Sequence, residues 1–188
     1  MSQLSISDII QHVGYLPQNP NDLLFSETVR EELAVTLRNH GLQEDPLSIV
    51  SLLNMLGLGE KMNAYPRDLS VGERQRVALA SITIHDPEII FLDEPTRGMD
   101  YGAKLDLSSI LKVWRDQGKS IMLITHDVEF ASIFADRIAI LEEGKFLFSG
   151  SPQVALTHFP AYRTQTAALF PGTNWITPLD IPESIHPF

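Results

Sequence analysis

Apolar and polar positions follow a helical spacing in three successive segments of the chain. The first segment begins at a capping-box pattern, Thr28-Val29-Arg30-Glu31, and the second at Asp45-Pro46, where proline takes the first helical position. The third begins at another capping box, Ser70-Val71-Gly72-Glu73. Glycines at Gly41 and Gly57 stop the first two. The predicted buried positions are Leu33, Ala34, Leu37, Ile49, Leu52, Leu53, Leu56, Val77, Leu79, Ala80 and Ile84. We expect three helices, the first two forming a small helical lobe.

Two short apolar runs, residues 88–93 and 120–125, predict strands that are buried on both faces of a parallel sheet. Between them a helix is expected from about Asp100, with Leu107, Ile110, Leu111 and Trp114 facing inward. Strand, helix and strand make a parallel crossover unit, so the fold class is α/β. Residues 137–142 and 146–149 flank Glu143-Gly144-Lys145 and predict a β-hairpin. From Pro160 onward we expect an irregular tail that packs on the body.

Composition narrows the classes of function. The chain has 188 residues, a formal net charge of -10 and no cysteine. The acidic balance argues against a nucleic-acid partner, whose phosphates attract basic surfaces. The lack of cysteine excludes a disulfide framework and fits a cytosolic protein. The start has no basic segment followed by an apolar one, and no apolar run is long enough to span a bilayer. Any role at a membrane is therefore expected to depend on a partner.

One short segment imitates a phosphate-binding loop. Gly118-Lys119-Ser120 matches the end of the pattern G-x-x-x-x-G-K-[ST], but Val113 stands where the earlier glycine is required. The context is also reversed, because a phosphate loop joins a strand to a helix N-terminus. Here a predicted helix ends and a strand begins. We interpret the segment as a glycine stop after a helix with a basic last turn.

Two longer segments carry the chemistry. Leu69-Ser70-Val71-Gly72-Glu73-Arg74-Gln75-Arg76 resembles the signature motif of ATP-binding-cassette (ABC) ATPases, and Ile89-Ile90-Phe91-Leu92-Asp93-Glu94-Pro95-Thr96 resembles their Walker B motif. The chain thus resembles the ATP-binding subunit of ABC transporters, from just before the Q-loop to the C-terminus. Gln18-Asn19-Pro20, followed by Asn21-Asp22-Leu23-Leu24-Phe25, is most similar to the ATPases of energy-coupling-factor importers for vitamins and transition metals.

This resemblance implies a P-loop NTPase-like ABC ATPase fold, a mostly parallel sheet with an inserted α-helical lobe. The family's first strands, its adenine-stacking aromatic residue and its phosphate loop have no counterpart in the 188 residues. We expect one partial domain over residues 1–188, with the helical lobe at about 19–69. The signature helix and catalytic core would occupy residues 70–150, and a C-terminal helix with the irregular tail residues 151–188. Absent strands would leave an apolar sheet edge and face uncovered, which predicts poor solubility or association.

The resemblance also implies roles for residues at strand ends. Asp93 would hold Mg²⁺, a cation that favours oxygen ligands, and Gln18 would sense the ion and the attacking water. Glu94 matches the general base, and His126 the switch histidine that bridges the γ-phosphate and the catalytic water. The alternative interpretations are a solvated acidic pair, a structural histidine and an unremarkable glutamine. The position of Asp93, Glu94 and His126 after buried strands favours the functional ones.

The signature segment is expected to act on a neighbouring subunit. Ser70, Val71, Gly72 and Glu73 would present a helix N-terminus to the γ-phosphate of ATP bound there, and they would also simply cap the helix. Val71 stands where the family often has glycine, and Glu73 where it often has glutamine. Asp100 falls on the D-loop aspartate, with helix capping as an equally good explanation. Its neighbours Arg97-Gly98-Met99 depart from the common Ser-Ala-Leu.

The leading expectation is an ATPase that couples ATP hydrolysis, with Mg²⁺, to transport across a membrane. Its partners would be a second ABC ATPase subunit, in a homo- or heterodimer, and a transmembrane transporter subunit at the cytoplasmic face of the cell membrane. One alternative is a non-catalytic remnant that supplies only its signature motif to a partner. The other is a soluble ABC protein outside transport, whose usual basic face, long coiled coil or second cassette the sequence lacks. Without a phosphate loop, negligible ATPase activity and weak nucleotide affinity are predicted for the isolated chain.

Overall fold

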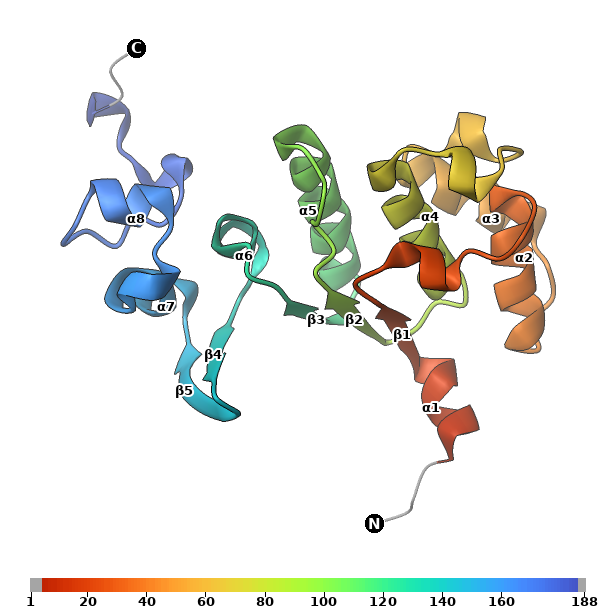
Figure 1. Ribbon diagram of the computed structural model, residues 1–188, viewed down its shortest axis with the longest axis horizontal. Helices are drawn as coiled ribbons and strands as arrows, with labels where there is room; N and C mark the ends of the chain where they lie inside the picture. The colour runs from red at the N-terminus through yellow and green to blue at the C-terminus, as the bar shows by residue number, and fades with distance from the viewer. Residues whose placement is uncertain (1–4, 186–188) are drawn as a thin grey trace. The chain divides into compact units, whose positions relative to one another are not determined.

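The computed structural model describes residues 5–185, and the chain divides into two compact units, Met1–Ile124 and Thr125–Phe188. The first unit is built on a three-stranded parallel sheet in the order β1 (Val13–Leu16), β2 (Ile89–Asp93) and β3 (Ser120–Ile124) (Figure 1). Leu16 pairs with Leu92, and Leu92 with Leu123, so the three strands end at the same edge. The α/β class and the parallel crossover from β2 to β3 are confirmed.

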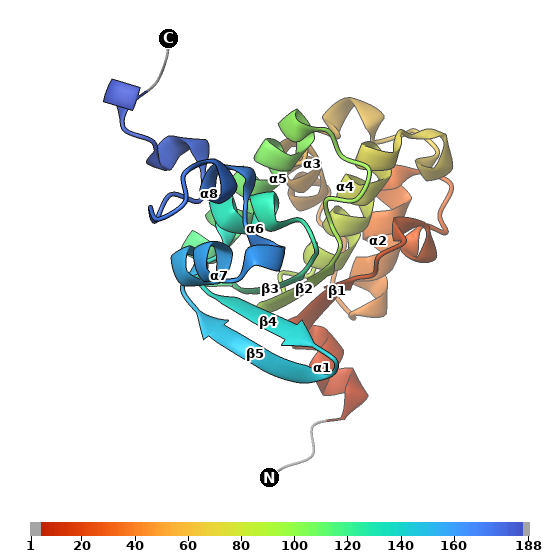
Figure 2. The same ribbon diagram turned by 60° about the vertical axis from the view of Figure 1, so that its left-hand side comes forward.

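The two faces of this sheet differ in burial. Leu16, Ile90 and Leu92 point to one face and are fully buried. On this face lie α4 (Val71–Thr83) and α5 (Tyr101–Asp116) (Figures 1 and 2). Side chains of the opposite face are apolar but about half exposed; they include Tyr15, Met122 and Ile124. The prediction that both strands are buried on both faces is therefore wrong, since α4 and α5 pack on one face only. The half-exposed apolar side chains of the other face agree with the expectation of an uncovered apolar face.

Local signals place the helices of the first unit. The helices are α1 (Ile6–His12), α2 (Val29–Asn39), α3 (Pro46–Met55), α4 and α5, with 3₁₀ turns at Pro20–Leu23, Gly59–Lys61 and Pro66–Asp68. The side chains of Thr28, Asp45 and Ser70 accept hydrogen bonds from first-turn N–H groups, as predicted. The capping box at Thr28 is only half formed, because the Glu31 carboxylate binds Arg38 at 2.5 Å instead. The predicted stripes are buried, except that Leu52, Ile84 and Ile110 are half-buried.

Helix α1 and strand β1 were not among the predicted elements. A capping box between Ser5 and Asp8 starts the helix. In β1, Gly14 faces the end of α4, and a methyl group added there would lie 2.5 Å from the Ile82 carbonyl oxygen. Glycine at this position lets the strand approach the helix closely. The first unit therefore needs a residue without a side chain where β1 crosses α4.

The second unit contains a β-hairpin and short helices. Its elements are α6 (Val128–Phe134), β4 (Ile138–Glu142), β5 (Lys145–Gly150), α7 (Pro152–His158) and α8 (Gln165–Leu169), with 3₁₀ turns at Pro160–Tyr162, Pro178–Asp180 and Glu183–Ile185. The hairpin is confirmed, although its turn is two residues, Glu143 and Gly144, both with positive φ. Ile140, Ala155, Leu156 and Ile176 form the core. Ile176 anchors the tail, which is not wholly irregular because α8 lies within it.

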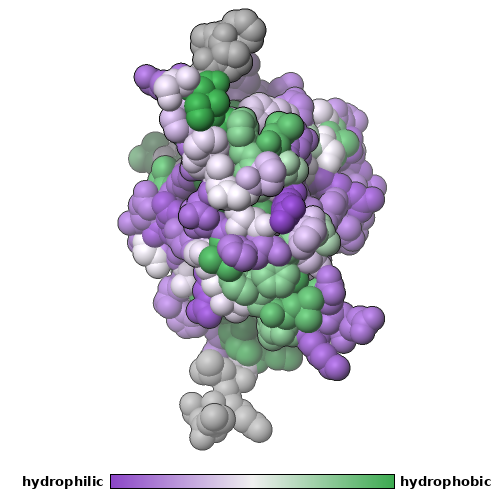
Figure 3. Space-filling view, turned by 90° about the vertical axis from the view of Figure 1, so that its left-hand side faces the viewer, coloured by the Kyte–Doolittle hydropathy of each residue, from purple (hydrophilic) through white to green (hydrophobic). Residues whose placement is uncertain are grey.

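Apolar side chains also reach the surface of the second unit. They gather over the β4–β5 hairpin (Figure 3), where Leu141, Phe146 and Leu147 are exposed. Over the described residues 5–185, none of the helices combines the length and apolar character needed to cross a membrane.

Candidate functional site

Three of the predicted site residues lie at the carboxyl edge of the parallel sheet. Asp93 is the last residue of β2, and Glu94 follows it. Gln18 follows β1 after Pro17, and β1 lies beside β2 in parallel register. Open parallel sheets bind ligands outside the carboxyl ends of their strands. The structure thus places Gln18, which the sequence analysis assigned only through the resemblance to the Q-loop, at the same edge of the first unit's sheet as Asp93 and Glu94.

Glu94 has an unusual backbone conformation. Its φ is 48°, in the left-handed region that side chains other than glycine rarely adopt. The Glu94 N–H donates a 2.8 Å hydrogen bond to the carbonyl oxygen of Ile124 at the end of β3, and the Glu94 carbonyl accepts one from the N–H of Arg97. These bonds hold the turn that directs the chain away from the sheet directly after Asp93. Backbone strain of this kind costs about 1–3 kcal/mol and is concentrated at functional sites.

The chemistry of this edge suits a hard cation. The Asp93 carboxylate and the Gln18 side-chain carbonyl offer oxygen atoms, the donors that Mg²⁺ prefers. Within residues 5–185, no group of three or more His, Cys, Asp or Glu side chains could hold a metal ion. Mg²⁺ that accompanies a nucleotide usually takes one or two carboxylates, substrate phosphates and water. The donor set therefore fits an ion bound together with a phosphorylated ligand.

The signature segment forms a capped helix N-terminus. The N–H of Ser70 donates to Glu73 Oε2 at 2.9 Å, and the N–H of Glu73 donates to Ser70 Oγ at 3.3 Å. The first of these bonds, together with the Ser70 hydroxyl, lowers the pKa of Glu73, with Lys61 Nζ 3.6 Å from Oε1 adding to the effect. Helix geometry leaves the N–H groups of Val71 and Gly72 without intrahelical partners. The helix end can therefore present N–H groups to an anion, while the Glu73 carboxylate is occupied within the cap.

Val71 and Gly98, noted above as departures from the common family pattern, lie against each other. A methyl group built on Gly98 would be 3.2 Å from Val71 Cγ1, and Gly98 has a φ of +74°. Glycine at position 98 thus leaves room for the larger side chain at position 71. This contact joins the signature segment to the turn between β2 and α5, and nothing in the sequence pattern predicts it.

The remaining predicted site residues lie in a helix cap and in a loop. Asp100 caps α5, with its Oδ1 accepting from the N–H of Ala103 at 2.8 Å. His126 lies in the second unit and is exposed, with its carbonyl accepting from the N–H of Val128. Asp127 beside it caps α6. The capping explanation for Asp100 is therefore realised, and a further role for either residue remains a prediction.

The imitation of a phosphate loop is a helix C-terminus, as predicted. Gly118 has a φ of 93°, and its N–H donates to the carbonyl of Arg115 at 2.8 Å. Lys119 Nζ lies 2.5 Å from Asp86 Oδ1 and 2.8 Å from the carbonyl oxygen of Pro87. Lys119 therefore ties the start of β3 to the start of β2 and faces away from the edge with Asp93.

One buried residue was missed by the sequence analysis. Glu32, on the first turn of α2, is buried and accepts hydrogen bonds from two backbone N–H groups of the segment after Gln18. Its spacing from Val29 and Thr36 places it on the buried side of the helix. A charged residue at such a position is the signal that could have revealed it.

Open parallel α/β sheets bind ligands, nucleotides among them, outside the carboxyl ends of their strands, and Asp93 and Glu94 lie at this edge of the sheet. The model of the ABC transporter family matches residues 1–97, just over half of the 188 residues. The chain therefore belongs to the ABC transporter family. The matched region includes Gln18, the signature segment and the Asp93-Glu94 pair.

Relatives support this assignment. A putative ABC transporter ATP-binding protein from Clostridium tetani is 41% identical over 172 residues, which cover 90% of this chain and 39% of that protein. An energy-coupling factor transporter ATP-binding protein from Thermotoga maritima is 37% identical over 77% of this chain and 55% of its own length. Another from Methanothermobacter thermautotrophicus is 41% identical over 77% of this chain and 47% of its own length. The chain thus spans 39–55% of the length of these relatives.

Proposed function

We propose that this chain is part of the ATP-binding and ATP-hydrolysing subunit of an ABC transporter, and that it couples hydrolysis to membrane transport. Family membership supports this, and the observation that carries it is the left-handed Glu94 directly after Asp93 at the end of β2. The similarity to energy-coupling factor transporter ATPases and the Gln18–Phe25 segment favour import of a vitamin or transition metal ion.

In this proposal the acidic edge performs the chemistry. Asp93 and Gln18 would hold Mg²⁺, which neutralises charge on the nucleotide phosphates when bound. Glu94 accepts the proton of the attacking water or orients that water toward the γ-phosphate. Its strained backbone, fixed by the bond to Ile124, directs the carboxylate from a set position. His126 would bridge the water and the γ-phosphate. A positioned base contributes roughly 10²- to 10⁴-fold in rate.

The signature helix serves a second subunit. Ser70, Val71, Gly72 and Glu73 form its N-terminus, and the partial positive charge there would stabilise the γ-phosphate of ATP bound to the partner. Asp100, as the D-loop aspartate, would communicate across that dimer. The partner is a second ABC ATPase subunit, identical or related.

The transport partner would lie in the membrane, with this chain peripheral to it at the cytoplasmic face. The helical lobe, residues 19–69, would transmit motion between that transmembrane subunit and the core at residues 70–150. Residues 151–188 would complete the domain as its C-terminal part.

The test is ATP hydrolysis by the complex of this chain with its partner ATPase and transmembrane subunits. Glu94→Gln should reduce the rate by at least about 100-fold while ATP binding is retained, because the base is lost and the phosphate contacts are kept. Glu88→Gln is the matched control, since Glu88 precedes the opposite end of β2 and pairs with His12 on the surface. Equal rates for the wild type and Glu94→Gln would overturn the catalytic role of Glu94.

A second candidate rests on the capped N-terminus of the signature helix, whose first-turn N–H groups can contact an anion on a partner. In that case the chain supplies its signature helix to a partner's nucleotide and binds none of its own. Isothermal titration of the 188-residue chain with Mg-ATP separates the two. This candidate predicts no binding in the micromolar range, and micromolar binding by the isolated chain excludes it.

A further inference from the structure

The C-terminal ends of three helices meet at one histidine. His40 is the C-cap of α2 and is half-buried. Its Nδ1 lies 2.8 Å from the carbonyl oxygen of Thr36, one turn earlier in α2, and its Nε2 lies 3.2 Å from the carbonyl oxygen of Ile10 in α1. Its ring stacks on the ring of His85, which follows the end of α4, with the two centroids 3.9 Å apart. His40 therefore contacts the ends of α1, α2 and α4.

The two hydrogen bonds of His40 need two ring protons. Both acceptors are carbonyl oxygens, so each bond requires an N–H on the ring. A neutral imidazole carries one N–H and the imidazolium carries two. The carbonyl of Ile10 is also one of the last four in α1, which have no partner within their helix. Helix C-termini carry partial negative charge and favour a cation beside them. The geometry thus fits a His40 ring with protons on both nitrogens.

His85 presents a neutral ring to His40. Its two ring nitrogens are buried and have no hydrogen-bond partner within the described residues 5–185. Burial, and then the adjacent His40 and Lys119, lowers the pKa of His85 from 6.5 to about 4. A charge on one ring of a stacked pair opposes a charge on the other. The two rings therefore differ in role, because His40 has acceptors for two protons and His85 remains neutral.

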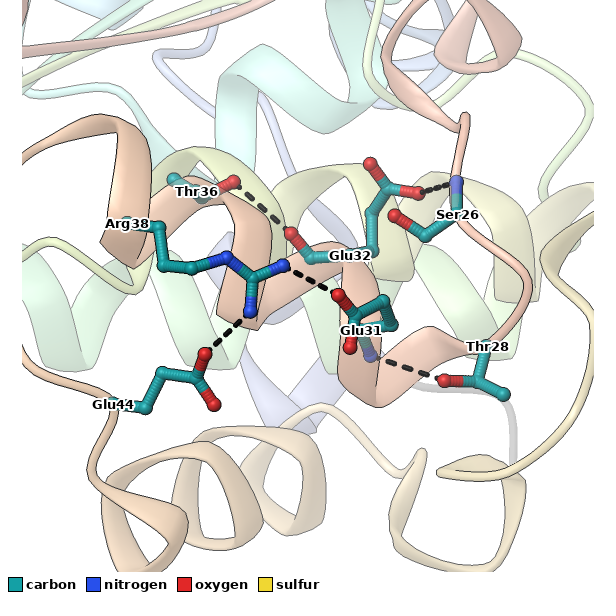
Figure 4. A network of polar contacts seen from close by, with 7 residues as sticks. All are labelled: Ser26, Thr28, Glu31, Glu32, Thr36, Arg38 and Glu44. Atoms are coloured by element: carbon teal, nitrogen blue, oxygen red, sulfur yellow. Dashed lines mark hydrogen bonds and ion pairs between the residues drawn. The ribbon is translucent and has the colours of Figure 1, made fainter.

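The other charged or titratable groups around His40 form ion pairs of their own. These pairs are Arg38 with Glu31 and Glu44 (Figure 4), Lys119 with Asp86, and His12 with Glu88. The pair of His12 and Glu88, 3.1 Å apart, joins the end of α1 to the residue before β2. A charged histidine strengthens that bond as well. The end of α1 is thus held by two histidines, of which His40 alone bonds to the helix backbone.

Loss of one proton from His40 removes one of its two bonds. The bond to Thr36 is shorter and lies within α2, so the remaining proton stays on Nδ1. Nε2 then directs a lone pair at the carbonyl oxygen of Ile10, and two acceptors cannot bond to each other. Helix α1 continues directly into β1 at Val13, and β1 is an edge strand of the sheet. Release at Ile10 therefore loosens the start of that strand.

We propose that His40 is a pH-sensitive latch: with both ring nitrogens protonated it fastens α1 and the start of β1 to α2, and on losing one proton it releases them. Histidine ordinarily changes charge between about pH 5 and 8, so the latch operates near physiological pH. The inference involves no nucleotide and is independent of the proposed function.

NMR of the full chain, labelled with ¹⁵N at histidine, tests the two protons directly. At about pH 5 the His40 ring should show two N–H signals, because a hydrogen-bonded proton exchanges slowly with water. At about pH 8 only the signal of the Nδ1 proton should remain. A His40 ring without N–H signals at the lower pH, or with both signals at the higher pH, would overturn the proposal without any variant.

Hydrogen exchange of the backbone amides tests the release. After correction for the intrinsic pH dependence of exchange, the amides of residues 10–12 should exchange about 10-fold faster at about pH 8 than at about pH 5, because a bond to a charged group is lost. The amide of Leu53, in the core of α3, should keep its corrected rate. His40→Gln should give the fast rate at both pH values. Equal rates at the two pH values in the wild type would contradict the latch.

Two variants serve as matched controls. His12→Gln removes the other histidine at the end of α1, and His85→Phe keeps a flat ring in the stack but has no titratable nitrogen. Both leave the two bonds of His40 in place, so the pH response of residues 10–12 should persist in each. A response that disappears in either control, or survives in His40→Gln, would assign the effect to another group and overturn the role of His40.

Discussion

The contact between Val71 and Gly98 gives the sharpest test of the site's internal packing. Gly98→Ala adds a methyl group 3.2 Å from Val71 Cγ1, at a residue whose φ is +74°. The left-handed conformation costs an alanine roughly 1–2 kcal/mol. Val71 lies on the first turn of a helix, where a β-branched side chain has one preferred rotamer. Moving it away costs about 0.5–1.5 kcal/mol more. We expect Gly98→Ala to lower the free energy of unfolding by about 2–3 kcal/mol.

A double-mutant cycle separates the backbone cost at position 98 from the cost of moving the Val71 side chain. Val71→Ala alone should cost less than about 1 kcal/mol, because the side chain is 47% exposed. In the Val71→Ala background only the backbone term remains, so the two substitutions should couple by about 0.5–1.5 kcal/mol. Urea unfolding of the four proteins measures this coupling. Gly102→Ala in α5 is the control, because its new methyl group makes only an ordinary 3.4 Å contact with Asp100.

Additive losses would refute the reasoning, since they would mean that Val71 does not occupy the space above Gly98. A loss that grows in the Val71→Ala background would refute it equally. The control should be stabilised by about 0.5–1 kcal/mol, as expected for alanine replacing glycine within a helix.

Three further predictions concern stability. Gly14→Ala should cost about 2–4 kcal/mol in urea unfolding, since its methyl group would lie 2.5 Å from the Ile82 carbonyl oxygen, which belongs to the backbone. Burial, then the adjacent His40, lowers the pKa of His85 from 6.5 to about 4. As the pH falls, the unfolded chain therefore takes up a proton at this histidine before the folded chain does. The free energy of unfolding should decrease by about 1–2 kcal/mol between pH 6.5 and 4, and His85→Gln should remove this pH dependence. The helix cap at Ser70 lowers the pKa of Glu73 below its ordinary value of 4.5. The ionised Glu73 carboxylate therefore stabilises the fold at pH values above 4.5. Ser70→Ala should cost about 1 kcal/mol at pH 7 and less at pH 3, compared by thermal unfolding.

Local signals explain which parts of the fold could be predicted. The caps at Asp45 and Ser70 and the stripes of α2, α3 and α4 depend on residues a few positions apart, and the structure confirms them. The same holds for the hairpin around Gly144. Strand β1 was missed because it has four residues, one of them glycine, and too little alternation to reveal a strand.

Long-range packing explains the errors. Which face of β2 and β3 is covered depends on where α4 and α5 pack, so the half-exposed Met122 and Ile124 could not be read from two apolar runs. The position of Asp93 and Glu94 at the carboxyl edge was predictable because they follow a recognisable apolar run, whereas that of Gln18 was not, because it depends on the missed strand β1. The residue types alone do not predict the contact between Val71 and Gly98 or the left-handed φ of Glu94.

The central claim is that the carboxyl edge of β2 hydrolyses ATP with Glu94 as the base. The most direct measurement is single-turnover hydrolysis of prebound Mg-ATP by the assembled complex, comparing the wild type with Glu94→Gln. Because binding is complete before the measurement, only the chemical step is observed. The account predicts a fall of roughly 10²- to 10⁴-fold with ATP still bound. A rate unchanged by Glu94→Gln would contradict it.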